Sequence, residues 1–239
     1  MTDEQLGFEV ISSFLQDVAR CHVDGAIYRG HADKKWHAIP SAFRENGYGI
    51  TSKQRLDRWR AIASRFANPK PNDDLEALAL AQHYGIATAL LDWTSHPLTA
   101  LFFACQKTKD KSFGEVLLAE RDNFEHLRRT TRIDVFKADR SKPALIDTSS
   151  LNNRSTAQDS FMSLHAERSF TMLRLVPVFG ISDRDKRFAL AALRVLGLSP
   201  ERVYADLGVA AREYNEWLQI DEMMNGEKDM FFPFKGAEG

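Results

Sequence analysis

Apolar residues in this chain follow two alternating spacings, and this alternation limits the fold more than any other feature of the sequence. Stripes at intervals of three and four residues, typical of amphipathic helices, are separated by short apolar runs typical of buried strands. The helical stripes fall in residues 3–21, 56–66, 75–84, 98–107, 121–129, 188–196 and 203–218. The runs that predict strands are 26–30, 86–93, 114–119, 133–136, 161–164 and 170–179, the last expected in the middle of a sheet.

The predicted elements are not divided by any repeat, low-complexity tract or glycine- and serine-rich linker within the 239 residues. A chain of this length suits one large domain or two small ones, and nothing marks a boundary. We therefore predict one mixed α/β domain of the α+β class over residues 1–224, with a central sheet of about six strands flanked by helices. Residues 225–239, polar around Phe231-Phe232-Pro233-Phe234, are predicted to form a separate tail.

Charge and cysteine content exclude several classes of protein. The 32 Lys and Arg against 33 Asp and Glu leave a net charge of −1, so no global positive field holds a phosphate backbone. Cys21 and Cys105 are too distant in sequence for a disulfide framework, and Cys21, His22, His31 and His37 match no metal-ligand spacing, so no metal is predicted. An acidic N-terminus, with no apolar stretch near the roughly 20 residues that span a bilayer, predicts a cytoplasmic protein without membrane contact.

The richest basic stretch is Arg128-Arg129-Thr130-Thr131-Arg132, continued by Lys137, Arg140 and Lys142. Asp134 and Asp139 interrupt it, which favours a solvated face over a local track for RNA or DNA phosphates, although both interpretations stay open. The common phosphate-loop, dinucleotide, nucleophile-elbow and zinc-protease motifs are absent from the sequence.

Three polar clusters lie inside or beside apolar segments, where a charge without a partner is costly. The first is Tyr28-Arg29-Gly30. An arginine within a strand presents a planar, two-pronged guanidinium that suits a phosphate or a carboxylate. A buried ion pair with Asp92 is the alternative, and the sequence leaves both open.

The second cluster is Gln82-His83-Tyr84-Gly85 followed by residues 90–97, LLDWTSHP, around a helix end, a strand and the next helix start. Free amides at a helix N-terminus attract anions, although Asp92 taken alone is better explained as a residue that locks the loop by capping. The third cluster is residues 152–158, where the amide of Gln158 precedes an apolar run. Because polar groups in apolar segments need partners, we expect the three clusters to converge on one cleft.

In this order the clusters resemble the FRG domain family, which is named after its first motif. The most specific part is residues 81–94, AQHYGIATALLDWT, which is similar to the family block Q-H-Y-G-x-P-T-x-L-L-D-W-T and is followed by a similar helix at 97–104. The segment Asn152-x-Arg154-x-x-x-Gln158 resembles a third motif, so the resemblance covers about residues 10–220. Ala87 stands where the family usually has proline and Ala89 where arginine is common, and Asp159-Ser160 stand where a glycine is expected.

The family layout is similar to that of ADP-ribosyltransferases and implies NAD as a substrate. On this resemblance Arg29 clamps the diphosphate, Thr94 or Ser95 holds the nicotinamide ribose, Trp93 or Tyr84 stacks on a ring, and Gln158 bonds a ribose hydroxyl. The implied catalytic residues are Arg29, Thr94, Gln158, His83 and Asp92. The implied NAD-binding residues are Tyr28, Arg29, Gly30, Gln82, Tyr84, Trp93, Ser95 and Arg154.

One departure concerns the glutamate that most such transferases carry on a later strand. The nearest carboxylates to Gln158 are Asp159 and Glu167, and neither stands in the usual Glu-x-Glu or Gln-x-Glu form. A carboxylate stabilises developing positive charge better than an amide does. Either one of these acids substitutes, or the activity differs.

Three functions are therefore open. The first is an NAD-dependent ADP-ribosyltransferase acting as an intracellular bacterial toxin in anti-phage defence, with RNA, DNA or protein as acceptor and an antitoxin or another protein as partner. The second is a non-catalytic module that binds a nucleotide or a phosphorylated partner. The third, a nuclease using Asp92, His83 and a metal, comes last because paired acidic ligands are missing.

Overall fold

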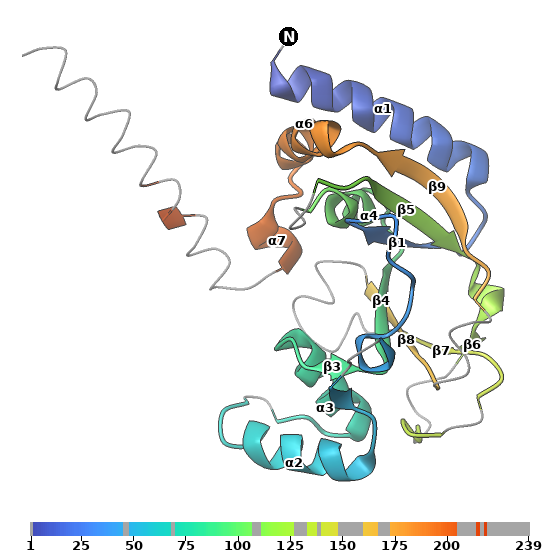
Figure 1. The fold of residues 1–239 in the computed structure, drawn as a ribbon, viewed down its shortest axis with the longest axis vertical. Helices are drawn as coiled ribbons and strands as arrows, with labels where there is room; N and C mark the ends of the chain where they lie inside the picture. Colours follow the sequence, from blue (N-terminus) through green and yellow to red (C-terminus); the bar gives the residue numbers. More distant parts are fainter. Residues whose placement is uncertain are drawn as a thin grey trace, which may run out of the picture.

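The computed structural model describes residues 2–44, 48–67, 70–106, 111–126, 133–137, 140–147, 160–166, 173–204, 214–215 and 218. Figure 1 shows the arrangement of these segments. The predicted tail at 225–239, the basic residues at 128–132 and the site residues Arg154 and Gln158 lie outside the described residues.

The described residues contain one sheet of seven strands in the order β6-β7-β8-β4-β1-β5-β9. Its neighbouring strands are antiparallel except for β6 and β7, which are parallel. The strands are β1 (Ile27–His31), β4 (Leu90–Thr94), β5 (Gly114–Ala119), β6 (Glu125–His126), β7 (Ala144–Asp147), β8 (Ser160–Leu164) and β9 (Val176–Ile181). The short strands β2 (Gly49–Ile50) and β3 (Ala87–Thr88) form a separate parallel pair. The α+β prediction is confirmed, with one strand more in the main sheet than the six predicted.

Helices cover the two ends of this sheet. At one end α1 (Asp3–Cys21) and α6 (Asp183–Val195) pack together next to β9, and α4 (Pro97–Ala104) packs on β1 and β5 (Figure 1). At the other end lie α2 (Lys53–Ala63) and α3 (Asp74–His83). Short helical turns are η1 (Ser41–Phe43), η2 (Arg121–Asn123) and α7 (Pro200–Tyr204). None of the described helices has the length and apolarity needed to cross a membrane.

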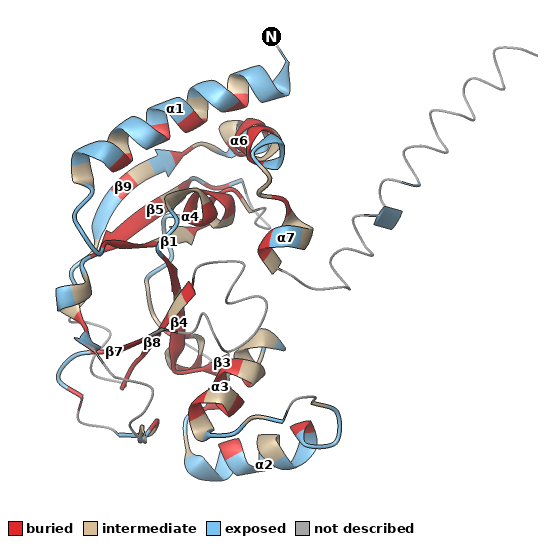
Figure 2. Ribbon diagram, turned by 180° about the vertical axis from the view of Figure 1, so that it is seen from behind, coloured by how far each residue is buried: buried red, intermediate tan, exposed pale blue. Residues whose placement is uncertain are grey.

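Two apolar cores correspond to these two ends, and a third is separate from both. The first lies between α1, α4, α6 and β5, and the second between α3, β4, β7 and β8. The third surrounds Ile27, Trp93 and Phe124. Figure 2 shows the buried residues concentrated along β1, β4, β5 and α4, so the strands that carry the first two polar clusters lie in the interior.

Local signals explain most of the helix ends. Thr2 and Gln5 form a capping box at the start of α1. The carboxylate of Asp73 accepts the main-chain N–H of Glu76 at 2.8 Å and starts α3, as the sequence predicts. Gly85 follows that helix with a φ of +79°, a left-handed conformation that favours glycine.

Several strand predictions are wrong. Residues 133–136 form a turn, in which the Asp134 carboxylate accepts the N–H of Phe136 at 3.0 Å, and the strand lies instead at β7. The predicted helix at 121–129 is also wrong over its described part, where η2 and β6 stand, and residues 127–129 lie outside the described residues. The last predicted strand starts only at Val176, and β9 is an edge strand rather than a central one. Short apolar runs look alike in sequence, and the available pairing partners decide which of them becomes a strand.

The segment 86–93 also differs from its prediction as one strand. It divides at Ala89 into β3 and β4, which pair in different sheets. Ser95 does not cap α4 as predicted, because the N-cap residue is His96 and its N–H donates to Thr94 Oγ1 at 3.0 Å. The side chain of Thr94 therefore belongs to the turn between β4 and α4.

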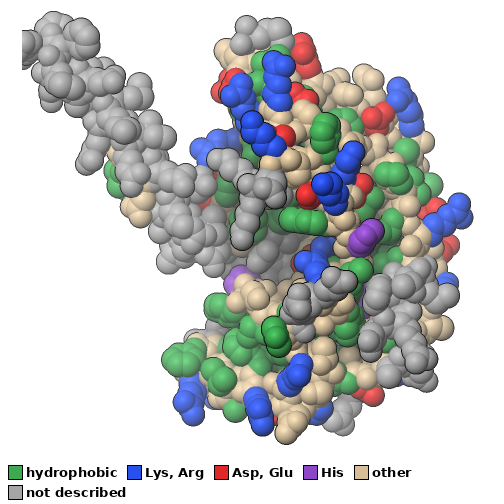
Figure 3. All heavy atoms as spheres, in the orientation of Figure 1, with side chains coloured by type: hydrophobic (Ala, Val, Ile, Leu, Met, Phe, Trp, Pro, Cys, Tyr) green, Lys and Arg blue, Asp and Glu red, His purple; other side chains and the backbone are tan. Residues whose placement is uncertain are grey.

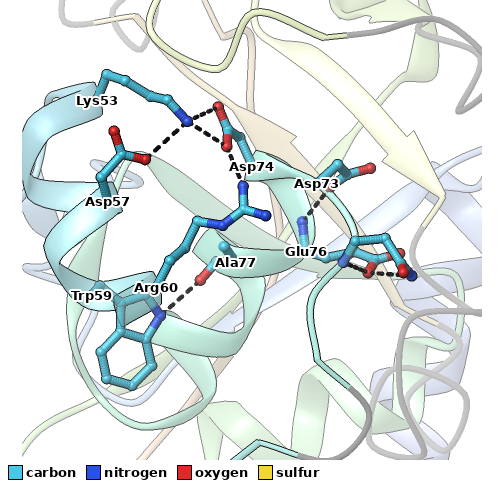
Figure 4. A network of polar contacts seen from close by, with 9 residues as sticks. Lys53, Asp57, Trp59, Arg60, Asp73, Asp74, Glu76 and Ala77 are labelled. Carbon is cyan, nitrogen blue, oxygen red and sulfur yellow. Dashed lines mark hydrogen bonds and ion pairs between the residues drawn. The ribbon is translucent and has the colours of Figure 1, made fainter. Parts of the chain in front are cut away.

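Ion pairs join α2 to α3 (Figure 4). Lys53 Nζ lies 2.8 Å from Asp74 Oδ1 and 3.0 Å from Asp57 Oδ1, and Arg60 Nη1 lies 2.6 Å from Asp74 Oδ1. Trp59 Nε1 donates to the carbonyl of Ala77 at 3.0 Å. These contacts fix the helix that carries Gln82.

Replacing Asp74 with asparagine is expected to lower the free energy of unfolding by about 1 kcal/mol at neutral pH, because partly exposed ion pairs are weak. Burial opposes ionisation, but Lys53 and Arg60 outweigh it and lower the pKa of Asp74 below its ordinary 3.8. A lowered folded pKa stabilises the fold above the unfolded pKa, and this contribution is lost as pH falls through the folded value. Urea unfolding should therefore show a deficit that disappears in acid.

Asp57→Asn is the matched control, since Asp57 contacts Lys53 from a more exposed position. We expect it to change stability less than Asp74→Asn. A deficit of Asp74→Asn that persists unchanged in acid would show that its carboxylate charge is not the cause.

Candidate functional site

Strands β1 and β4 lie side by side at Tyr28 and Thr94 and border a cavity of about 120 Å³. Its wall is formed by seven residues: Tyr28, Arg29, Gly30, Asp92, Trp93, Thr94 and Phe103. All except Phe103 belong to the first two polar clusters of the sequence. The fold thus places residues 28–30 and residues 92–94, which are more than sixty residues apart in the sequence, on adjacent strands.

The guanidinium of Arg29 is anchored at two points. Its Nη1 donates to the main-chain carbonyl of Asp92 at 2.6 Å, and its Nε donates to His31 Nε2 at 3.1 Å. No hydrogen bond joins Nη2 to the described part of the chain. Burial lowers the pKa of Arg29, the Asp92 charge opposes this and Arg44 adds to it, but an arginine stays cationic at neutral pH. The direct ion pair considered from the sequence is not formed, because the guanidinium contacts the carbonyl and not the carboxylate of Asp92.

The carboxylate of Asp92 is held from α3 instead. Gln82 Nε2 donates to Asp92 Oδ2 at 2.7 Å, and Thr88 Oγ1 donates to Gln82 Oε1 at 2.6 Å. The same hydroxyl accepts the N–H of Leu90 at 3.3 Å. Asp92 thus locks the chain through Gln82 and not by capping a helix. Gln82, which was expected to bind NAD, does not line the cavity but contacts Asp92 of its wall.

Replacing Gln82 with glutamate is expected to destabilise the protein by about 1–3 kcal/mol at neutral pH. The change removes the donor to Asp92 Oδ2 and brings two carboxylates together. The loss should shrink in acid, because one proton shared by the pair restores the hydrogen bond. Chemical unfolding across pH measures this effect.

Gln16→Glu on the exposed face of α1 adds the same charge and should stay within about 0.5 kcal/mol of the parent. Equal stability of the two variants would contradict the Gln82–Asp92 contact.

Two aromatic residues of the cavity wall, Tyr28 and Trp93, are buried in apolar cores. Trp93 is 2% exposed, its Nε1 donates to Ser163 Oγ at 2.7 Å, and its ring packs edge-on against Phe124. Tyr28 is fully buried, and its hydroxyl lies 2.8 Å from His22 Nδ1. The Trp93 ring and its Nε1 thus have partners within the protein, and stacking of Trp93 on a ligand ring stays a prediction.

Besides Gln82, three predicted residues among those described do not line the cavity: His83, Tyr84 and Ser95. The Tyr84 side chain is 67% exposed, and its ring lies near His83 and Trp59 at the end of α3. Ser95 is exposed ahead of α4. His83 and Tyr84 thus lie at the end of α3, and Ser95 lies in the turn after β4.

Sequence reasoning missed two buried histidines beside the cavity wall. His31 is the first, and it follows Arg29 by two residues on β1. His165 is the second. Its Nε2 lies 2.7 Å from Ser163 Oγ, and burial together with the charge of Arg29 lowers its pKa to about 3. The two-residue period of a strand, which puts residues 29 and 31 on one face, is the signal that could have identified His31.

The described end of the basic stretch does not form a phosphate track. Arg140 is 8% exposed and donates to the carbonyl of Asp134 at 2.6 Å, and Lys142 donates to the carbonyl of Asp122 at 2.9 Å. Figure 3 shows Lys and Arg side chains interspersed with Asp and Glu on the face drawn. Within the described residues no group of three His, Cys, Asp or Glu is placed to hold a metal ion.

The two clusters that meet at the cavity carry the motifs by which the sequence can be compared with known families. Residues 24–112 match the FRG domain. The matched segment runs from just before β1 to just after α4 and contains every residue of the cavity wall. It ends before residues 152–158, so the third motif is not part of the match. No curated protein and no solved structure matches the chain.

Proposed function

We propose that this protein is an NAD-dependent ADP-ribosyltransferase in which the β1–β4 cavity holds the diphosphate end of NAD. The anchored guanidinium of Arg29 carries the proposal. Two of its nitrogens are fixed by Asp92 and His31, while Nη2 keeps its N–H groups for a ligand. A planar donor held in place suits the oxygens of a phosphate.

The size of the cavity suits part of a dinucleotide. Pockets that enclose whole ligands measure about 300–1,000 Å³. The cavity of about 120 Å³ therefore takes the group that contacts Arg29, and the rest of NAD extends beyond the wall.

The proposed reaction breaks the bond between nicotinamide and the ribose. Nicotinamide leaves with the electron pair, positive charge develops on the ribose, and a nucleophile on the acceptor bonds to the ribose carbon and gives up its proton. Asp92 is the acidic residue of the cavity wall and is proposed to stabilise this charge, with Thr94 holding the ribose. Gln158, outside the described residues, remains the proposed ligand of a ribose hydroxyl.

The resemblance to the FRG family supports the wider setting of this proposal. We extend it to a cytoplasmic bacterial toxin in anti-phage defence that modifies RNA, DNA or protein and is held in check by an antitoxin or another partner protein.

Incubation of the purified protein with NAD labelled in its adenylate half, and with separate pools of RNA, DNA and protein, tests the chemistry. We expect nicotinamide release and transfer of label to one pool, with both reduced in Asp92→Asn. NAD binding without nicotinamide release would contradict the transferase. It would support the alternative, a non-catalytic binding module. The observation that favours this alternative is the hydrogen bond from Gln82 to the Asp92 carboxylate, because it occupies the acidic group proposed for catalysis.

A further inference from the structure

His31 is a buried partner of Arg29 whose chemistry the proposed reaction leaves unused. The residue is 3% exposed, and its Nε2 lies 3.1 Å from Arg29 Nε. An arginine N–H only donates, so Nε2 of His31 must accept. A neutral imidazole with an accepting Nε2 carries its proton on Nδ1.

The surroundings of His31 keep its ring neutral. Burial, together with the charges of Arg29, Arg44 and His37, lowers the pKa of His31 to about 4. On β5, Glu115 Oε1 lies 3.5 Å from His31 Nδ1, and burial raises the pKa of Glu115. At neutral pH the His31 ring is therefore neutral, and its Nε2 keeps the lone pair that accepts the Arg29 Nε–H.

The two anchors of Arg29 constrain its orientation. A guanidinium is planar and has five N–H groups, and contacts from Nε and Nη1 in different directions prevent it from rotating freely. Neither anchor uses Nη2.

We propose that His31 is a positioning residue for Arg29, which accepts the Nε–H and leaves the Nη2 side to bind a phosphate or diphosphate. The identity of the ligand rests on the proposed function, whereas the positioning does not.

Two variants of matched size distinguish hydrogen-bond acceptance by residue 31 from simple packing of its side chain. His31→Gln keeps a side-chain acceptor, and His31→Leu removes it. In protein labelled with 15N-arginine, exchange of the Arg29 Nε–H with solvent should be about tenfold faster in His31→Leu and near the parent rate in His31→Gln. The dissociation constants of NAD and of pyrophosphate, measured by calorimetry, should rise about tenfold in His31→Leu and recover in His31→Gln.

Glu115→Gln is the control, because a neutral His31 needs no carboxylate partner. It should leave both the exchange and the binding unchanged. Loss of binding in Glu115→Gln equal to that in His31→Leu would indicate a cationic His31 and overturn the proposal. Unchanged Arg29 Nε–H exchange in a folded His31→Leu would overturn it as well.

The parent protein provides a test that no folding defect affects. Nitrogen chemical shifts of His31 should show a neutral ring with the proton on Nδ1, and a proton on Nε2 would overturn the proposal. If the parent releases no nicotinamide from NAD, the proposed function fails, while the exchange and tautomer measurements still decide the role of His31.

Discussion

Replacing Gly30 with alanine is expected to destabilise the protein by about 3 kcal/mol or more. A Cβ at Gly30 would lie 1.9 Å from the carbonyl oxygen of Ala100 and 2.6 Å from the main-chain nitrogen of Ala104. Both atoms belong to the backbone of α4, so relief requires the whole helix to move away from β1. Thermal and urea unfolding measure the loss.

Gly180→Ala is the matched control, because Gly180 also lies in a strand and no heavy atom is within 4 Å of its added Cβ. We expect a change within about 0.5 kcal/mol. A Gly30→Ala variant as stable as this control would show that α4 does not press on β1. The geometry gives Gly30 a packing role, and its predicted role in NAD binding stays a prediction because Gly30 also lines the cavity.

Replacing Arg29 with lysine is expected to weaken NAD binding about 100-fold and to reduce nicotinamide release accordingly. Lysine keeps the charge, but its single nitrogen cannot serve Asp92, His31 and a phosphate with the geometry of a planar fork. Calorimetry measures the affinity, and circular dichroism confirms that the variant is folded.

Arg20→Lys provides the control, since Arg20 is exposed on α1, pairs with Asp17 across one helical turn and is not part of the cavity wall. It should bind NAD like the parent. Normal NAD affinity of a folded Arg29→Lys protein would refute recognition through the guanidinium fork and, with it, the proposed use of the cavity.

The polar clusters show how far the candidate site follows from sequence. The expectation that residues 28–30 and 92–94 meet is confirmed by the cavity that they line. An ion pair between Arg29 and Asp92 was also considered from the sequence. The two residues do contact each other, but Arg29 donates to the main-chain carbonyl of Asp92, whereas the carboxylate accepts a hydrogen bond from Gln82. Which lone pair meets which donor depends on strand register and loop path, and residue types do not specify these.

The sequence by itself determined the elements whose signals are local. The periods and caps of α1, α3 and α6 lie within a few residues of each helix, and β5 was predicted with its observed bounds. Only the tertiary structure decided that residues 133–136 turn, that β9 is at the edge and that His31 contacts Arg29. The physical reason is that strand pairing and buried hydrogen bonds join residues far apart in the chain, so their free energy depends on partners that local patterns do not identify.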